Sequence, residues 1–238
     1  MTRLTLGIAY YQNPGMLAQQ FRVWAAYPVA LKAQIEAIVV DDSSPEPAAH
    51  VPRPAGLPKL TIGRLADVAD PRTPPWRQDA ARNRAAHEAA GEWLFLTDMD
   101  HVLPSESLEY IFDHCLDGPD VVYTFQRLDA PNLTPKLDTH GLPHPHPNTY
   151  LLTKRRYWAI GGYDESCGGV YGTDGPFRAA LLQQSTIVHL DRVPIVRYAR
   201  DVIADASTRT DRQAFKRPVR VRVPPAVLSV PYRQQVSA

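Results

Sequence analysis

The chain alternates between short apolar runs and longer stretches in which apolar residues recur every three or four positions. Apolar runs are typical of buried strands, and the longer spacing is typical of helices that pack on a sheet. We predict strands at 3–10, 35–40, 60–62, 93–96, 120–125, 148–153, 186–190 and 193–198. We predict helices at 14–27, 76–90, 105–115, 154–160 and 177–184. Strands that alternate with helices in this way indicate an α/β protein with a mainly parallel sheet.

Acidic residues directly follow two of the predicted strands. Asp41 and Asp42 come after the second strand, and Asp98 and Asp100 come after the fourth. In an open α/β sheet, ligands bind outside the carboxyl ends of the strands. One residue separates Asp98 from Asp100, so in an extended chain their side chains point the same way. Such a pair also occurs in solvated turns, but its place after an apolar strand favours a site for Mg²⁺ or Mn²⁺ held jointly with substrate phosphates.

Three further residues are candidates for chemistry. Arg82 lies on the predicted helix 76–90, on a turn that reaches toward Asp98. Asp174 lies at the start of a predicted helix, where unpaired N–H groups and the helix dipole keep a carboxylate ionised, so it is either a cap or a reactive group. His189 lies inside a predicted strand, where a buried structural histidine is commoner than a metal ligand.

Composition is that of an ordinary globular protein, with 44% hydrophobic and 21% charged residues and a net charge of +1. This charge indicates no particular partner. The N-terminal residues lack the apolar core of a signal peptide, and no apolar run approaches the ~20 residues that cross a bilayer. Cys115 and Cys167 lack the spacing of metal ligands and are interpreted as reduced thiols. We therefore expect a cytoplasmic protein without a membrane span.

Two segments do not follow the strand and helix pattern. The segment 127–147 contains five prolines and three histidines, His140, His144 and His146, and loops of this length are typically lids or disordered. The histidine spacing is compatible with a metal site, but the intervening prolines favour a flexible loop. Residues 209–238 carry seven Lys or Arg against one acid, with four prolines, and predict an extended basic tail.

Four short motifs, in this order, resemble those of GT-A-fold glycosyltransferases, especially the inverting family 2 type. They are IAYYQNPGML at 8–17, VVDDSS at 39–44, ARN at 81–83 with GEWLFLTDMD at 91–100, and GGYDE at 161–165 with YGTD at 171–174. Each motif is weak alone, but their order and spacing agree with the family over roughly residues 3–200. The chain departs from the usual pattern at Ala9, Gln12, Ser43 and Thr173, where the family usually has proline, asparagine, glycine and glutamate.

The resemblance implies a GT-A, Rossmann-like fold with a mixed, mainly parallel sheet flanked by helices. It implies one domain at 1–200, with a nucleotide-sugar half at 1–100 and an acceptor half at 101–200, followed by the basic extension at 201–238. The implied site residues are Tyr11, Asp41 and Asp42 at the nucleotide base, Arg82 and Asp98 at the ribose or phosphates, Asp98, Asp100 and His189 at the metal, and Asp174 as general base.

The implied reaction moves a sugar from a UDP- or GDP-sugar to an acceptor hydroxyl with inversion, aided by Mn²⁺ or Mg²⁺. The acceptor is a glycan, a small molecule or a hydroxymethylated DNA base, the last reached as a single strand or by base flipping. One alternative is a sugar nucleotidyltransferase on the same fold, although its Gly-, Arg- or Lys-rich first loop is not present at 10–13. Another is a nucleic-acid-binding or scaffold protein that uses the basic tail.

Overall fold

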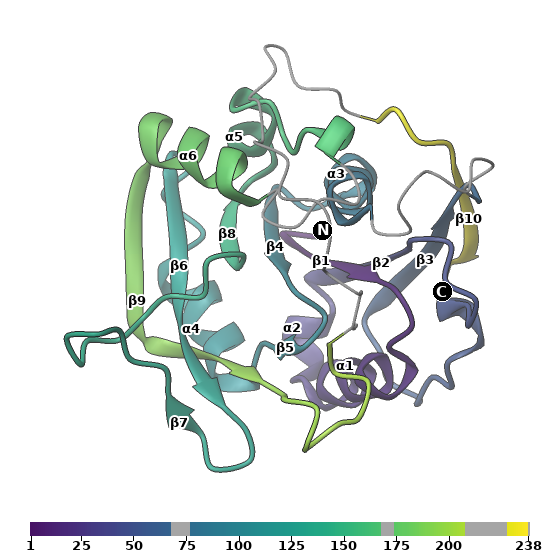
Figure 1. Cartoon of the computed structure of the whole chain (residues 1–238), viewed down its shortest axis with the longest axis horizontal. Coiled ribbons are helices and arrows are strands. Elements are labelled where there is room, and N and C mark those ends of the chain that lie inside the picture. The colour runs from purple at the N-terminus through teal and green to yellow at the C-terminus, as the bar shows by residue number, and fades with distance from the viewer. Residues whose placement is uncertain (68–76, 168–173, 208–227, 238) are drawn as a thin grey trace.

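The computed structural model describes residues 1–67, 77–167, 174–207 and 228–237, and all structural statements below refer to these residues. The strands are β1 (Leu4–Tyr10), β2 (Ile35–Asp41), β3 (Lys59–Leu65), β4 (Trp93–Thr97), β5 (His101–Val102), β6 (Val121–Asp129), β7 (Thr134–Pro135), β8 (Tyr150–Thr153), β9 (Thr186–Arg197) and β10 (Tyr232–Ser237). The helices are α1 (Pro14–Ala26), α2 (Val29–Lys32), α3 (Gln78–Glu88), α4 (Ser105–His114), α5 (Lys154–Ala159) and α6 (Asp174–Gln184), with short 3₁₀ turns at Ala48–His50 and Glu165–Cys167. Figure 1 shows these elements around one sheet.

The described strands form a single mixed sheet in the order β10-β3-β2-β1-β4-β8-β6-β9-β5, with β7 paired to β6. The central block β3-β2-β1-β4 is parallel, as the alternating pattern predicts. Strand β8 is antiparallel to both β4 and β6, which makes the sheet mixed. The prediction of a mixed, mainly parallel α/β sheet flanked by helices is therefore confirmed.

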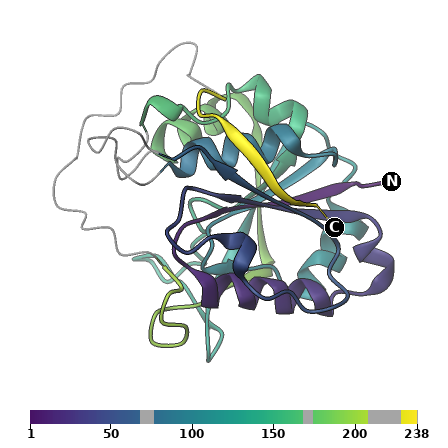
Figure 2. The same cartoon turned by 90° about the vertical axis from the view of Figure 1, so that its right-hand side faces the viewer.

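Helices cover both faces of the sheet, as Figure 2 shows edge-on. One core cluster packs the side chains of α1 and α4 under the sheet, including Phe21, Trp24 and Leu108. The second cluster packs the alanine-rich face of α3 with Tyr157 and Phe177 on the other side. Because both faces are covered, all seven residues of β1 and of β2 are buried, which explains why these strands are continuous apolar runs in the sequence.

Strand β9 replaces the two strands predicted at 186–190 and 193–198. Its pairing with β6 shifts register between Phe125 and Gln126, whose partners are Leu190 and Pro194. The extra residues of β9 form a bulge at this point, and their polar side chains interrupt the apolar pattern. A bulge lets one strand continue through a polar interruption, which is why the sequence pattern indicated two strands.

The segment 127–147 was predicted as a flexible loop and is instead an arm with its own pairing. β6 continues to Asp129, β7 pairs back onto it, and isolated bridges join Leu137 to Pro143 and Gln126 to Pro145. The arm thus returns along β6 and delivers the residues just before β8 to the end of β4. Proline does not prevent this arrangement because it is tolerated at sheet edges, where its missing N–H is not needed.

The described end of the predicted basic tail belongs to the sheet. Tyr232–Ser237 form β10, which pairs antiparallel with β3. Glu165 accepts hydrogen bonds from the backbone N–H groups of Leu228 at 2.5 Å and Ser229 at 2.7 Å, just before this strand. Three of the four prolines and six of the seven basic residues of the tail lie outside the described residues. Within the described ranges, no helix has both the length and the apolar character needed to cross a bilayer.

Candidate active site

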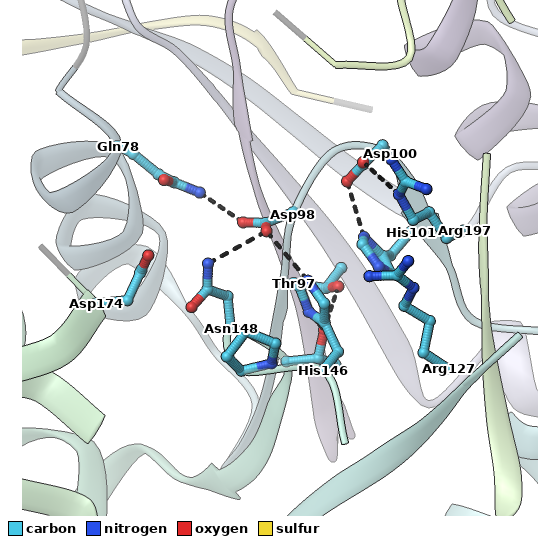
Figure 3. A network of polar contacts seen from close by, with 12 residues as sticks. Gln78, Thr97, Asp98, Asp100, His101, Arg127, His146, Asn148, Asp174 and Arg197 are labelled. Atoms are coloured by element: carbon cyan, nitrogen blue, oxygen red, sulfur yellow. Dashed lines mark hydrogen bonds and ion pairs between the residues drawn. The ribbon is translucent and has the colours of Figure 1, made fainter. Parts of the chain in front are cut away.

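The candidate site lies where β4 ends and the chain turns toward β5. The backbone N–H of His101 donates to the carbonyl of Asp98 at 3.1 Å, so residues 98–101 form a turn. In a turn the side chains of alternate residues no longer point the same way, unlike in an extended strand. Asp98 and Asp100 have separate sets of partners (Figure 3), and their joint binding of one cation stays a prediction.

Asp98 receives donors from two distant parts of the chain. Its Oδ1 atom accepts from Gln78 Nε2 at 2.7 Å and from Arg82 at 2.5 Å, and both donors lie on α3. Its Oδ2 atom accepts from Asn148 Nδ2 at 3.3 Å and lies 3.5 Å from His146 Nε2. Asp98 thus joins helix α3 to His146 near the end of the arm and to Asn148 just after it.

Asp100 points to the opposite side of the turn. Its Oδ1 atom lies 2.8 Å from His101 Nδ1, and its Oδ2 atom lies 3.5 Å from Arg197 Nε at the end of β9. Burial raises the pKa of Asp100, but the neighbouring His101 and Arg197 outweigh this effect and lower the pKa below its usual value. Asp100 is therefore an ionised carboxylate that holds an imidazole ring in place.

Two imidazole rings meet beside Asp98. The rings of His101 and His146 lie with their centroids 3.8 Å apart, and their side chains are 2% and 7% exposed. His146 Nδ1 lies 2.8 Å from Thr149 Oγ1. Burial and the neighbouring His101 lower the pKa of His146 well below its usual value, so this ring is neutral at pH 7. One ligand atom each from Asp98, His101 and His146 lies within 4.8 Å of the other two, a separation that admits a metal ion.

Arg82 connects two of the predicted site carboxylates, Asp98 and Asp174. Its guanidinium donates to Asp98 at 2.5 Å, to Asp174 at 3.0 Å and to the hydroxyl of Tyr163 at 2.6 Å, with a side chain only 1% exposed. Asp174 opens α6, as predicted. Burial raises the pKa of Asp174, and the opposite charge of Arg82 only partly offsets this increase. The site thus holds a carboxylate with a raised pKa, which is characteristic of groups that transfer protons.

The predicted nucleotide-side residues lie in the loops that follow β1 and β2. Asp41 is fully buried, and its carboxylate accepts from the backbone N–H groups of Ser44 at 2.7 Å and Ala48 at 2.9 Å. Asp42 pairs with Arg77 Nε at 2.7 Å, and burial raises the pKa of Asp42 to about 6 despite this partner. Burial and the charge of Asp42 raise the pKa of Tyr11, which is half-buried. Asp41 therefore shapes its own loop, whereas Asp42 is buried against Arg77 and lies near the half-buried Tyr11.

His189, the predicted further metal ligand, is not brought to Asp98 or Asp100. On β9, His189 lies opposite Thr124 of β6, and its Nδ1 atom is 3.2 Å from Thr124 Oγ1. β9 is three positions from β4 in the sheet, which is ~14 Å at about 4.8 Å per strand. The residue of β9 that reaches Asp100 is Arg197, because it lies at the carboxyl end of the strand.

Sequence reasoning missed several partners in the site. Gln78, Asn148, Tyr163 and Arg197 were not predicted as site residues, and His146 was interpreted as part of a flexible loop. His101 carried a readable signal because it directly follows the acidic pair. Asn148 and His146 carried none, because their positions depend on the arm folding back along β6.

Comparisons with known proteins agree with this geometry. The family model described as "Glycosyl transferase family 2" matches residues 25–171, more than half of the chain. None of the curated proteins compared with the chain matches it in sequence.

Similar solved structures include glycosyltransferases with low sequence identity. TarS 1–349 from S. aureus is 14% identical with a TM-score of 0.58, over 86% of this chain and 63% of that chain. GalNAc-T7, solved with UDP, GalNAc and Mn²⁺, is 11% identical with a TM-score of 0.59, over 83% of this chain and 43% of that one. The mannosyltransferase PcManGT from Pyrobaculum calidifontis, solved with GDP-Man and Mn²⁺, is 16% identical with a TM-score of 0.56, over 82% of this chain and 56% of that one.

At these identities the structural matches establish the fold, which is that of the GT-A glycosyltransferases. The chain spans under two thirds of the length of each of these three structures. The family match covers β2 to β8 and includes the acidic turn at Asp98. With this match over most of the sheet and its carboxyl edge, the chain belongs to glycosyl transferase family 2.

Proposed function

We propose that the protein transfers a sugar from a UDP- or GDP-sugar to an acceptor hydroxyl, with inversion at the sugar and with the help of a divalent cation. One observation carries the proposal: the buried Arg82 joins the half-buried Asp98 and Asp174 in a single ion cluster at the carboxyl edge of the sheet. Relatives of the same fold were solved with UDP-GlcNAc or with GDP-Man and Mn²⁺, which supports a nucleotide-sugar donor here.

Asp174 acts as the general base in this proposal. It takes the proton of the acceptor hydroxyl as the hydroxyl oxygen bonds to the anomeric carbon, and the bond from that carbon to the diphosphate breaks on the opposite side. The diphosphate leaves with the bonding electrons. A raised pKa makes Asp174 a stronger proton acceptor, and Arg82 keeps its carboxylate oriented.

The donor lies across the ends of β1, β2 and β4 in this proposal. Tyr11 and Asp42 lie at the nucleotide base, and Arg82 and Asp98 lie toward the ribose and phosphates. Asp41 supports this arrangement indirectly, because its carboxylate closes the loop that carries Asp42. Tyr11 itself is half-buried just after β1, near Asp42.

The side chains at the acidic turn fit a divalent cation. His101 Nε2 is buried without a hydrogen-bond partner among the described residues, and it belongs to the group of three that lies within ligand distance. When bound, a cation such as Mn²⁺ or Mg²⁺ would neutralise charge on the departing diphosphate. In this proposal the protein's own residues orient the donor and accept the proton of the acceptor hydroxyl.

Asp174→Asn tests the assignment of the base. We expect the release of UDP or GDP from sugar donors, measured with Mn²⁺ and with water as acceptor, to fall by ~10²–10⁴-fold. Stabilisation of the fold by UDP or GDP in thermal unfolding should remain, because the nucleotide contacts are unchanged. Glu109→Gln, an exposed carboxylate on α4, is the matched control and should keep the wild-type rate.

Two results would contradict the proposal. The first is wild-type protein that is stabilised by neither nucleotide and releases none from any donor. The second is Asp174→Asn with the wild-type rate, which would remove the base while leaving the donor site intact.

A further inference from the structure

We propose that the cation of this protein is bound by Asp98, His101 and His146, and that Asp100 lies outside the coordination shell as the residue that orients His101. The site then prefers a transition metal such as Mn²⁺, Co²⁺ or Zn²⁺ over Mg²⁺ or Ca²⁺. The inference deepens the proposed function, on which it rests for the cation's role in transfer, but the binding site itself can be tested without transfer.

The three ligand atoms already converge without a metal. One from each residue lies within 4.8 Å of the others, and His146 Nε2 lies 3.5 Å from Asp98 Oδ2. Two atoms bound to one metal at ~2.1 Å lie about 3–4 Å apart, so a small inward movement completes the set. Figure 3 shows His146, near the end of the arm, beside Asp98.

The hydrogen bonds of the two histidines leave one ring nitrogen of each able to bind a metal. His101 Nδ1 faces Asp100 at 2.8 Å, which leaves Nε2 buried without a described partner. His146 Nδ1 faces Thr149 Oγ1 at 2.8 Å, which leaves its Nε2 directed at Asp98. A histidine that binds a metal through one nitrogen usually donates from the other to a carboxylate or another oxygen. Asp100 and Thr149 have the positions of such outer partners.

The oxygen contacts separate the roles of the two aspartates. Both oxygens of Asp100 are already engaged, one by His101 Nδ1 at 2.8 Å and the other by Arg197 Nε at 3.5 Å. On Asp98, Gln78 and Arg82 engage Oδ1 at 2.7 and 2.5 Å, whereas the Oδ2 contacts are longer, at 3.3 and 3.5 Å. Asp98 Oδ2 is therefore the carboxylate oxygen whose present contacts are most readily exchanged for a bond to a metal.

The ligand chemistry determines which metals suit the site. Two imidazoles and one carboxylate favour transition metals, whereas Mg²⁺ and Ca²⁺ prefer sites built from oxygen alone. A dication on one carboxylate and two neutral rings keeps a net positive charge, which suits a diphosphate.

Direct metal binding tests the inference on the full chain without nucleotide. We expect metal-free wild-type protein to bind one Co²⁺, followed by its visible absorption, and to bind Mn²⁺ in competition, with millimolar Mg²⁺ displacing neither. His101→Gln and His146→Gln should each weaken Co²⁺ binding by more than about 100-fold, because each removes a ligand. Asp100→Asn should weaken it by about 10–100-fold with the absorption bands kept, as expected for an outer partner.

His144→Gln is the matched control. His144 lies two residues before His146 on the same arm, and its Nδ1 atom is 2.8 Å from the carbonyl of Pro145. It is not part of the three-residue cluster, so its variant should bind Co²⁺ as the wild type does. Circular dichroism checks that each variant folds, and pulsed EPR of Mn²⁺ in the wild type detects nitrogen ligands without any substitution.

Each outcome has one meaning. Absence of nitrogen coupling to Mn²⁺, or loss of binding in Asp100→Asn with His146→Gln unchanged, would overturn the inference in favour of an acidic pair. Failure to bind any divalent metal would overturn it as well. Metal binding as expected in a protein that releases no nucleotide would contradict the proposed function alone, and nucleotide release that does not depend on the two histidines would contradict the inference alone.

Discussion

Arg82 is the residue on which the candidate site depends most. A buried guanidinium is costly to desolvate, and it is retained here because two carboxylates and one hydroxyl share it. It fixes the distance between the donor-side Asp98 and Asp174, which come from opposite halves of the chain. Lysine cannot replace it, because a single ammonium lacks the planar fork that reaches several acceptors at once.

Arg82→Lys tests the effect of this sharing on the base. Burial raises the pKa of Asp174 and Arg82 lowers it, so a weaker partner should raise it further. The reaction needs ionised Asp174, so the acid limb of kcat/KM should lie above pH ~4 in the wild type and move to higher pH in the variant. Rates of nucleotide release from pH 4 to 9 measure this shift. Arg84→Lys, one turn away from the site, is the control, and an acid limb that stays in place would refute the coupling.

Glu36 is a second buried carboxylate, far from the site. It accepts from Thr5 Oγ1 at 2.8 Å, the Ala90 N–H at 2.6 Å and Lys59 Nζ at 3.0 Å, which ties β1, β2 and the end of α3 together. Burial raises the pKa of Glu36, but these hydrogen bonds outweigh burial and lower it below its usual value. Its contribution to stability is therefore present above pH ~4.3 and is lost as the pH falls through the lowered pKa.

Glu36→Gln should lower the free energy of unfolding at pH 7 by about 2–3 kcal/mol, because hydrogen bonds to a charged group are lost. The difference from the wild type should shrink as the pH falls through the lowered pKa of Glu36, where the carboxylate becomes protonated. Urea unfolding at pH 7 and in acid measures both effects. Glu88→Gln, a more exposed carboxylate on α3, should change stability by less than ~0.5 kcal/mol. A loss for Glu36→Gln that is equally large in acid would show that its charge is unimportant.

At the scale of elements, the order of strands and helices follows from the sequence wherever an element is continuous and regular. The apolar runs at β1, β2 and β4 and the alanine-rich α3 could be predicted because both faces of the sheet are covered. The pattern was insufficient at β9, where a bulge interrupts the alternation, and at β5 and β7, which have two residues each. β10 was missed because its residues are mostly polar, as expected for a strand at the edge of a sheet.

Gly63 on β3 makes room for β10. A Cβ atom built at Gly63 would overlap the ring of Tyr232, whose other contact is Arg84, with its guanidinium carbon 4.9 Å from the ring centroid. Gly63→Val should displace this ring and loosen β10 while the central strands stay intact. We expect the backbone amides of 232–237 to exchange about tenfold faster or more, which corresponds to ~1.4 kcal/mol of local stability.

Hydrogen exchange followed by mass spectrometry measures this effect peptide by peptide. Thr61→Val, a change two residues earlier on β3 with a similar increase in apolar character, is the control. It should leave the protection of 232–237 unchanged. Protection in Gly63→Val equal to that of the wild type would show that the Tyr232 ring contributes little to holding β10.

At the scale of the whole molecule, the site combines local motifs with long-range contacts. Asp98, Asp100 and Asp174 could be predicted because each lies at the end of a strand or at the start of a helix, where the sequence marks the boundary. Asn148 and His146 reach Asp98 from about fifty residues away, and no local pattern specifies that approach. The strand order of the sheet decides which histidine lies near Asp98, and the prediction of His189 as a metal ligand was made without knowledge of that order.

The pairing of β10 with β3 has a consequence for shortened versions of the protein. Removing the last ten residues would leave the apolar strand KLTIGRL with a row of unsatisfied backbone groups on one side. The opposite margin has different protection, because β5 pairs with β9 at Val196 and Arg197, and the rest of β9 carries Asp191, Arg192 and Pro194. A truncated chain should therefore self-associate through its β3 margin, by strand exchange between copies, before its interior unfolds.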